Sequence, residues 1–129
     1  MTNPPPSSAT PVFTDLAGPD VLSSPSSTPA AKWGKFALGR LLATPGALAL
    51  LTEFGVSPLT LLMRHASGDW GELDDRDRQV NELAVVHGDR ILSAYVLRRV
   101  ELGQTVEARV WVITEADRAV TTVLRPSDY

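Results

Sequence analysis

The chain has 129 residues, with 12 basic side chains, 15 acidic side chains and no cysteine. This length suits one domain, and without cysteine there are neither disulfide bonds nor thiolate metal sites. The nearly balanced charge lacks the strongly basic footprint of a duplex-binding protein. No apolar run approaches the roughly 20 residues that span a bilayer. We therefore expect a cytoplasmic protein that does not associate with membranes.

Residues 1–31 are predicted to be a disordered tail. Seven of the ten prolines and ten serines and threonines lie in the first thirty residues, where Asp15 and Asp20 are the only charged side chains. Such a segment has too few apolar groups to offset the entropy lost on ordering. We expect one α+β domain over residues 32–129, with a lead over residues 31–44 that covers part of the core.

Two short helices are predicted next, and each begins with a capping residue followed by proline. In "TPGALALLTEFG", Thr44 can accept hydrogen bonds from the first amides and Pro45 suits the first helical position. Gly55 offers a left-handed stop. The segment "SPLTLLMRH" repeats the pattern, with Ser57 as the cap. The spacing indicates a helical pair joined by a tight turn.

A third helix is predicted over residues 74–87. Asp74 is a good N-cap, and Asp75 and Asp77 fall in the first turn, where the helix dipole favours negative charge. Gly88 ends the helix. Apolar spacings of three and four predict one inward face, made of Val80, Leu83, Ala84 and His87.

After Gly88 the pattern changes to that of β-strands. Valine, isoleucine, threonine and aromatic residues are typical of strands, and they dominate residues 90–97, 108–115 and 119–126. A polar link, "RRVELGQTVE", joins the first two strands, and "EADR" joins the second to the third. The prediction is an α+β domain of about three short helices followed by a three-stranded antiparallel meander.

The acidic segment from Asp69 to Asp89 holds seven acids and two arginines, and three interpretations compete for it. A metal site is one, because His65 and Asp69 are four residues apart, but a third ligand at a recognised spacing is missing. An acid–base pair is another, and it needs a cleft. The start of a helix accounts for the aspartates most simply, so we predict no metal and no cofactor.

Four residues are candidates for a binding surface: His65, Asp69, Trp70 and Arg118. Trp70, in the loop "SGDWG", is either a lid over the core or an exposed contact, and an indole's large buried area favours the lid. His65 is either a packed or capping residue or a general base, and we favour the first. Arg118 belongs to a hairpin tip, where polar residues are expected in any case.

A resemblance to a known family is carried by four segments: "LGRLLATPGAL", "HASGDWGELDDRDRQVNE", "RILSAY" and "VWVITEADRAVTTVLRPSDY". Over residues 38–129 the chain resembles small bacterial proteins encoded on plasmids and integrative elements. Their labels include "plasmid-related protein" and "type I restriction endonuclease subunit M". The second label implies a modification-methyltransferase role, yet no motif for methyl transfer or nuclease chemistry is present here. This chain differs by its tail and its longer "RRVELGQTVEA" connection.

We favour a non-catalytic accessory or binding protein of a mobile genetic element, associated with restriction–modification or DNA metabolism and acting on a protein partner. One alternative is a DNA mimic that blocks restriction enzymes through its acidic helix. Another is a small toxin-like ribonuclease, a class in which helices precede an antiparallel sheet. Its RNA-binding face would need five arginines to converge: Arg90, Arg98, Arg99, Arg109 and Arg125.

Overall fold

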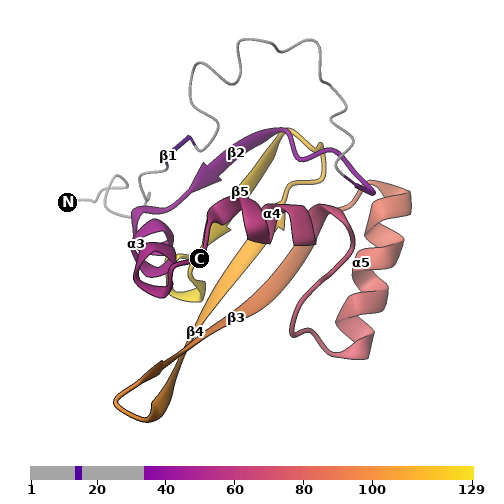
Figure 1. Ribbon diagram of the computed structural model, residues 1–129. Helices are drawn as coiled ribbons and strands as arrows, with labels where there is room; N and C mark the ends of the chain where they lie inside the picture. Colours follow the sequence, from indigo (N-terminus) through magenta and orange to yellow (C-terminus); the bar gives the residue numbers. More distant parts are fainter. Residues whose placement is uncertain (1–13, 16–33) are drawn as a thin grey trace, which may run out of the picture.

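The computed structural model describes residues 14–15 and 34–129, which form an α+β fold with three helices beside a mixed sheet (Figure 1). The predicted tail, residues 1–31, lies outside the described residues except for Thr14 and Asp15. In chain order the elements are β1 (Thr14–Asp15), β2 (Arg40–Ala43), α3 (Pro45–Phe54), α4 (Pro58–Ala66), α5 (Asp75–His87), β3 (Ile91–Glu101), β4 (Gln104–Thr114), β5 (Val120–Leu124) and the 3-10 helix η1 (Pro126–Asp128).

The predicted helix ends are confirmed. The Thr44 hydroxyl accepts a hydrogen bond from the Ala47 amide at 3.1 Å, which satisfies one of the amides left free in a first turn. Gly55 ends α3 with a left-handed φ of 67°. Among the described residues no single helix has the length and apolar composition to cross a membrane, although α3 and α4 meet those criteria as a pair bent by 103°.

The sheet has more strands than predicted, because β2 and the two-residue β1 add to the three strands of the meander. Its order is β1-β2-β5-β4-β3, and β2 runs parallel to β5 whereas the other neighbours are antiparallel. The lead expected over residues 31–44 therefore contributes a strand, and the predicted three-stranded meander is only part of the sheet. The Arg40 amide donates to the Ala119 carbonyl at 2.9 Å, and the Thr44 amide donates to the Val123 carbonyl at 3.0 Å.

Helices α3 and α4 cover one face of this sheet, as Figure 1 shows. The contacts are apolar, and burial of that surface is the main favourable contribution to folding. The buried residues of this core are Leu38, Leu41, Ala43, Ala47, Leu51, Leu61, Leu62, Ala66, Tyr95, Leu97, Val110, Val112 and Val123.

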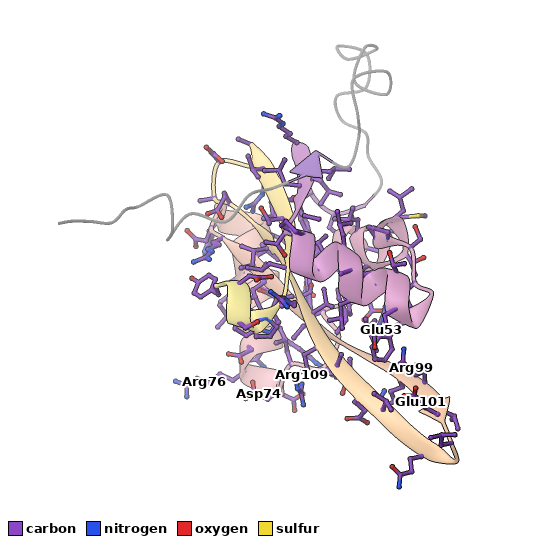
Figure 2. All side chains as sticks on the ribbon, turned by 90° about the vertical axis from the view of Figure 1, so that its left-hand side faces the viewer. Glu53, Asp74, Arg76, Arg99, Glu101 and Arg109 are labelled. Atoms are coloured by element: carbon purple, nitrogen blue, oxygen red, sulfur yellow. The ribbon has the colours of Figure 1, made fainter. Side chains whose placement is uncertain are left out.

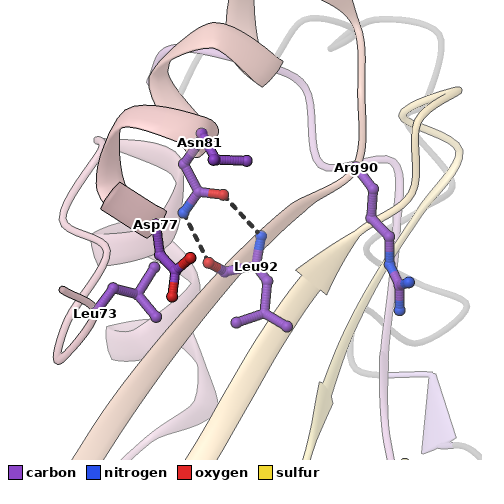
Figure 3. A pocket seen from close by; sticks show the side chains of 6 residues that line it. Leu73, Asp77, Asn81, Arg90 and Leu92 are labelled. Atoms are coloured by element: carbon purple, nitrogen blue, oxygen red, sulfur yellow. Dashed lines mark hydrogen bonds between the residues drawn. The ribbon is translucent and has the colours of Figure 1, made fainter. Parts of the chain in front are cut away.

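Helix α5 lies beside the edge strand β3, and its predicted inward face is wrong. Val80 and Leu83 are 56% and 58% exposed, and of the four predicted inward residues Ala84 is the buried one. The side chain of Asn81 points inward instead. Its amide donates to the Leu92 carbonyl at 2.7 Å and its oxygen accepts from the Leu92 amide at 3.2 Å (Figure 3). The helix thus satisfies backbone groups on the sheet edge, which apolar side chains cannot do.

The segment expected to be a polar link is the outer half of a long hairpin. Strands β3 and β4 pair continuously from Ile91 and Thr114 out to Glu101 and Gln104. Leu102, with φ 51°, and Gly103, with φ 77°, form a two-residue turn in which both residues are left-handed. We call residues 96–109 the arm; it projects from the body of the sheet in Figure 1.

Candidate functional site

Three of the four candidate residues lie around Phe36. His65 comes from the last turn of α4, Trp70 from the loop before α5, and Arg118 from the turn between β4 and β5. The ring of Phe36 meets His65 edge-on with centroids 5.2 Å apart, and it stacks on Trp70 at 6.1 Å. The Arg118 guanidinium lies 5.5 Å from the centroid of the same ring. Asp69 lies outside this group.

The loop that carries Asp69 and Trp70 is held against β3 by an isolated parallel bridge between Gly71 and Ala94. The Ala94 amide donates to the Trp70 carbonyl at 3.1 Å, and the Glu72 amide donates to the Ala94 carbonyl at 2.6 Å. Gly71 between them has φ 76°, and a Cβ atom there would lie 2.0 Å from the Ala94 carbonyl oxygen. Only glycine fits this close approach, which explains the glycine in "SGDWG".

His65 has no exposed surface, and hydroxyl groups satisfy both of its ring nitrogens. Its Nδ1 lies 2.6 Å from the Ser93 hydroxyl and its Nε2 lies 2.9 Å from the Thr114 hydroxyl. Thr114 is 2.7 Å from the Thr121 hydroxyl, which donates to the Leu38 carbonyl at 2.7 Å. The result is a buried chain of polar groups that links α4 to three strands and to the lead.

The direction of every hydrogen bond in this chain follows from Thr121. A hydroxyl has one proton, and Thr121 uses it on the Leu38 carbonyl, so Thr121 accepts from Thr114. Thr114 has then spent its own proton and accepts from Nε2 of His65. Neutral His65 therefore carries its proton on Nε2, and Ser93 donates to Nδ1. Each group in the chain is satisfied when the imidazole is neutral.

Burial reinforces that neutral state. Loss of hydration disfavours the imidazolium and, with a smaller contribution from the positive charge of Arg118, lowers the pKa of His65 to about 3. A serine donating to a histidine is also the geometry of an activated nucleophile. Here both Ser93 and His65 have no exposed surface. A substrate has no access to either atom, so the arrangement stabilises the fold and is not suited to acyl transfer.

Asp69 anchors the loop from its outer side. Its carboxylate accepts from Arg64 Nε at 2.7 Å and from the Gly71 amide at 3.1 Å. The hydrogen bond from Arg64 is the main reason that the pKa of Asp69 lies below its usual value. Below the loop, the Tyr95 hydroxyl donates to the Asp69 carbonyl at 2.6 Å, and burial raises the pKa of Tyr95. Asp69 and His65 therefore do not share a site.

Trp70 has the position of a core lid. It is 4% exposed, and its Nε1 donates to the Glu82 carboxylate at 2.9 Å. Lys35 lies 3.6 Å from the other oxygen of Glu82. The rim of this region opens into a surface pocket of about 310 Å³. The pocket is lined by Gly68, Asp69, Trp70, Gly71, Arg78 and Glu82.

Arg118 ties the β4–β5 turn to the end of α5. Its φ of 59° is left-handed, and its guanidinium donates to the Ala84 carbonyl at 2.9 Å and to the Asp89 carbonyl at 2.6 Å. Carbonyls at a helix C-terminus lack partners within the helix, and a cation there also complements the helix dipole. The Gly88 and Asp89 amides also donate to the Ala84 carbonyl, so Arg118 reinforces, from another part of the chain, a C-terminal cap that the backbone already forms.

The aspartates of the acidic segment begin α5, as predicted. The Asp74 side chain accepts from the Asp77 amide at 2.8 Å, and Asp75 and Asp77 lie in the first turn. Within residues 14–15 and 34–129, three or more metal-ligating side chains do not come together anywhere. The carboxylates do not converge on the imidazole, whose nitrogens face the Ser93 and Thr114 hydroxyls.

Sequence reasoning missed the partners of His65. Ser93, Thr114 and Thr121 are fully buried hydroxyl residues in strands. Their signal is a polar residue at an inward strand position among apolar neighbours, which needs a buried partner. The two ring nitrogens of His65 take Ser93 and Thr114 as partners, and Thr121 is the partner of Thr114. The three hydroxyls and the imidazole therefore form one hydrogen-bonded chain. Comparison of the chain with protein-family models, with curated proteins and with solved structures gave no match.

Proposed function

We propose that this chain is a non-catalytic binding module that acts on a protein partner. The observation that supports this most directly is the burial of His65, because neither its imidazole nor the Ser93 hydroxyl that donates to it has exposed surface. The other candidate residues also hold the fold: Trp70 closes the core and Arg118 caps α5. A chain whose candidate residues are used in this way is better suited to binding than to catalysis.

The family resemblance adds a setting to this proposal. The segments "HASGDWG" and "VWVITEADR" resemble those of small plasmid and integrative-element proteins. This resemblance favours an accessory role on a mobile genetic element, associated with restriction–modification or DNA metabolism. A cytoplasmic location forms part of the proposal, because a chain without cysteine needs no oxidising compartment.

A second candidate is RNA binding on the face of the sheet opposite α3 and α4. The register places Arg98, Arg109 and the partly exposed Trp111 on that face, and Arg90 lies over the ring of Tyr129, which meets Trp111 edge-on. Arg99 lies on the other side of the arm, as Figure 2 shows, and Arg125 follows β5 on the helix-covered side, where its guanidinium lies next to Gly46. The five arginines considered for a ribonuclease therefore do not converge.

Charge favours the protein partner over RNA. Arg98 pairs with Glu107 at 2.9 Å and Arg90 lies 3.9 Å from Glu115, so Arg109 is the one of the three that has no acidic partner among the described residues. One such charge gives little of the counterion release on which nucleic-acid affinity depends. No contact in the described residues specifically supports a DNA mimic.

Crosslinked affinity purification from a host that carries the element tests the binding proposal. We expect one protein to be enriched reproducibly with the tagged chain, and not with a tagged His65→Ala chain whose core is broken. Repeated failure to enrich a partner would contradict the proposal. A parallel assay with single-stranded RNA, read by cleavage and by fluorescence polarisation, should show neither cutting nor tight binding. Cleavage by the purified chain would favour the ribonuclease.

A further inference from the structure

Within residues 14–15 and 34–129, the outer edge of β3 is covered near the body of the sheet and uncovered along the arm. Asn81 occupies the outward amide and carbonyl of Leu92, and the Trp70–Glu72 loop occupies those of Ala94. In an antiparallel strand alternate residues direct both backbone groups to the same side. The next residues that face outward are therefore Val96, Arg98 and Val100, and β4 is the only strand of the described sheet that pairs with β3.

These three residues present an intact template for another strand. Each carries one amide and one carbonyl, which gives six outward backbone groups in an unbroken one-to-one register. Nothing in the described part of the chain hydrogen-bonds to them. Natural edge strands are usually short, bulged or covered, and a long uncovered edge is a site for pairing.

The arm is held in a fixed direction. Arg99 pairs with Glu53 of α3 at 2.9 Å and also donates to the Glu53 carbonyl at 3.0 Å. Its guanidinium lies 4.8 Å from the centroid of the Phe54 ring. Figure 2 shows Glu53 and Arg99 together on one side of the arm and Arg109 on the other. A strand that is already ordered loses little entropy when a partner pairs with it.

We propose that the β3 edge at Val96, Arg98 and Val100 binds an extended segment of a partner protein as an additional strand. This inference rests on the proposed function and names the surface and the chemistry of the partner. Backbone hydrogen bonds would supply much of the affinity, and alternate side chains would supply the specificity. At the tip, Val100 is 74% exposed and Leu102 is 99% exposed, which adds apolar surface beside the edge.

The positive charge of Arg98 favours a different protein, and not a second copy of this chain, as the partner of the β3 edge. Two copies that pair antiparallel through all three outward residues place Val96 opposite Val100 and Arg98 opposite Arg98. Like charges directly opposite each other destabilise a strand pair. Glu107 contacts only Nε of Arg98, so the two terminal nitrogens of this guanidinium can still donate to an acidic residue placed opposite. The expected partner segment is therefore extended, with an acidic residue between two apolar residues on one face.

A peptide-display selection on the full chain tests this assignment. Random nine-residue peptides are selected against the wild-type protein, against Arg98→Glu and against Arg109→Glu, the matched control on the neighbouring strand. We expect wild type and the control to enrich an acidic residue between β-branched residues, and Arg98→Glu to enrich a basic residue at that position. A peptide selected on wild type should bind Arg98→Glu about tenfold more weakly.

Hydrogen exchange places the bound peptide on the molecule. A selected peptide should slow exchange of the Val96, Arg98 and Val100 amides by about tenfold or more, because each gains a hydrogen-bond partner. Peptides that protect amides elsewhere would overturn the edge assignment and leave the binding function standing. The same would follow if Arg98→Glu selected the same peptides, or if these amides became protected by raising the protein concentration alone. Absence of any selected peptide together with absence of a host partner would remove both proposals.

Discussion

Thr121 determines which nitrogen of His65 carries the proton, although Thr114 lies between them. The Thr121 proton goes to the Leu38 carbonyl, so the two remaining hydrogen bonds can run in one direction only, from His65 Nε2 to Thr114 and from Thr114 to Thr121. A charged imidazole would need an acceptor at Nδ1, where Ser93 now donates. The fold is thus built around a neutral histidine.

Acid should destabilise the protein through His65. Its pKa is about 3 in the folded chain and about 6.5 in an unfolded chain, so the unfolded chain binds more protons between these values. The contribution of neutral His65 to the free energy of unfolding is then fully present above pH 6.5. It falls by up to about 1.4 kcal/mol per pH unit as the pH decreases toward 3. Urea denaturation between pH 7 and 4.5 measures this above the range of most carboxylates.

Two glutamine variants isolate the imidazole. His65→Gln keeps a donor and an acceptor and should remove most of the acid dependence over that range. His87→Gln, on the exposed end of α5, should retain it. If His65→Gln kept the full slope, another group would be responsible.

Loss of the Thr114 hydroxyl should destabilise the core. Thr114→Val removes the acceptor of His65 Nε2 and leaves a buried donor without a partner, at a cost of about 1–3 kcal/mol. Thr122→Val is the matched control, because its partly exposed side chain lies on the opposite face of the sheet. Its change should stay within about 0.5 kcal/mol. Equal effects of the two variants in denaturant titrations would contradict the account of the polar chain.

Trp70 should contribute to stability mainly by filling the core. Trp70→Ala is expected to cost about 3–5 kcal/mol, since the indole is 4% exposed and stacks on Phe36. Trp70→Phe keeps a ring and loses the hydrogen bond to Glu82, so its cost should be about 1–2 kcal/mol. Normal melting of Trp70→Ala together with lost partner binding would identify a contact residue instead.

Two glycines separate backbone strain from steric clash. Gly55 and Gly71 have φ of 67° and 76°, yet a Cβ on Gly55 meets nothing within 4 Å whereas one on Gly71 meets the Ala94 carbonyl at 2.0 Å. Gly55→Ala should therefore cost only the left-handed strain, about 1–2 kcal/mol. Gly71→Ala should cost clearly more and expose the Ala94 amide to hydrogen exchange. Similar melting temperatures for the two variants would argue against the close approach of the loop.

A substitution at the tip of the arm should stabilise the protein. Leu102 adopts a left-handed φ of 51° while its side chain is 99% exposed, so it bears backbone strain and gains no burial. Leu102→Asn should stabilise the protein by about 0.5–1 kcal/mol, because asparagine tolerates this conformation. Leu102→Ala, which removes the apolar side chain and keeps the strain, should not. Thermal denaturation of both variants decides whether strain is the cause.

The helices could be predicted because their signals are local. Caps such as Thr44 and Asp74 act within one turn, so the chain needs no tertiary information to begin α3 and α5. Strand β2 could not be predicted from "RLLA", since leucine and alanine favour helix and only the parallel pairing with β5 makes them a strand. The buried face of α5 was missed for a similar reason: Asn81 is inward because an edge backbone needs partners.

In the candidate site, too, local signals could be read from the sequence and tertiary contacts could not. His65, Trp70 and Arg118 were selected from the segment "HASGDWG" and from the hairpin tip "TEADR", and they gather around one aromatic ring, that of Phe36. Their roles depend on neighbours far along the chain, as with the hydrogen bond between His65 and Thr114. The residue type can identify a histidine as a candidate, but its burial decides whether it can take part in catalysis or only stabilises the fold.

The hairpin that carries the proposed edge can change its reach without altering the fold. Side chains alternate along β3 and β4, and the helices contact this pair mainly through residues no farther out than Leu97 and Arg99. Removing two residues from each strand would preserve which side chains face inward and would only bring the turn closer. Homologous chains with shorter or longer hairpins would then share one core and differ in how far the hairpin extends beyond it.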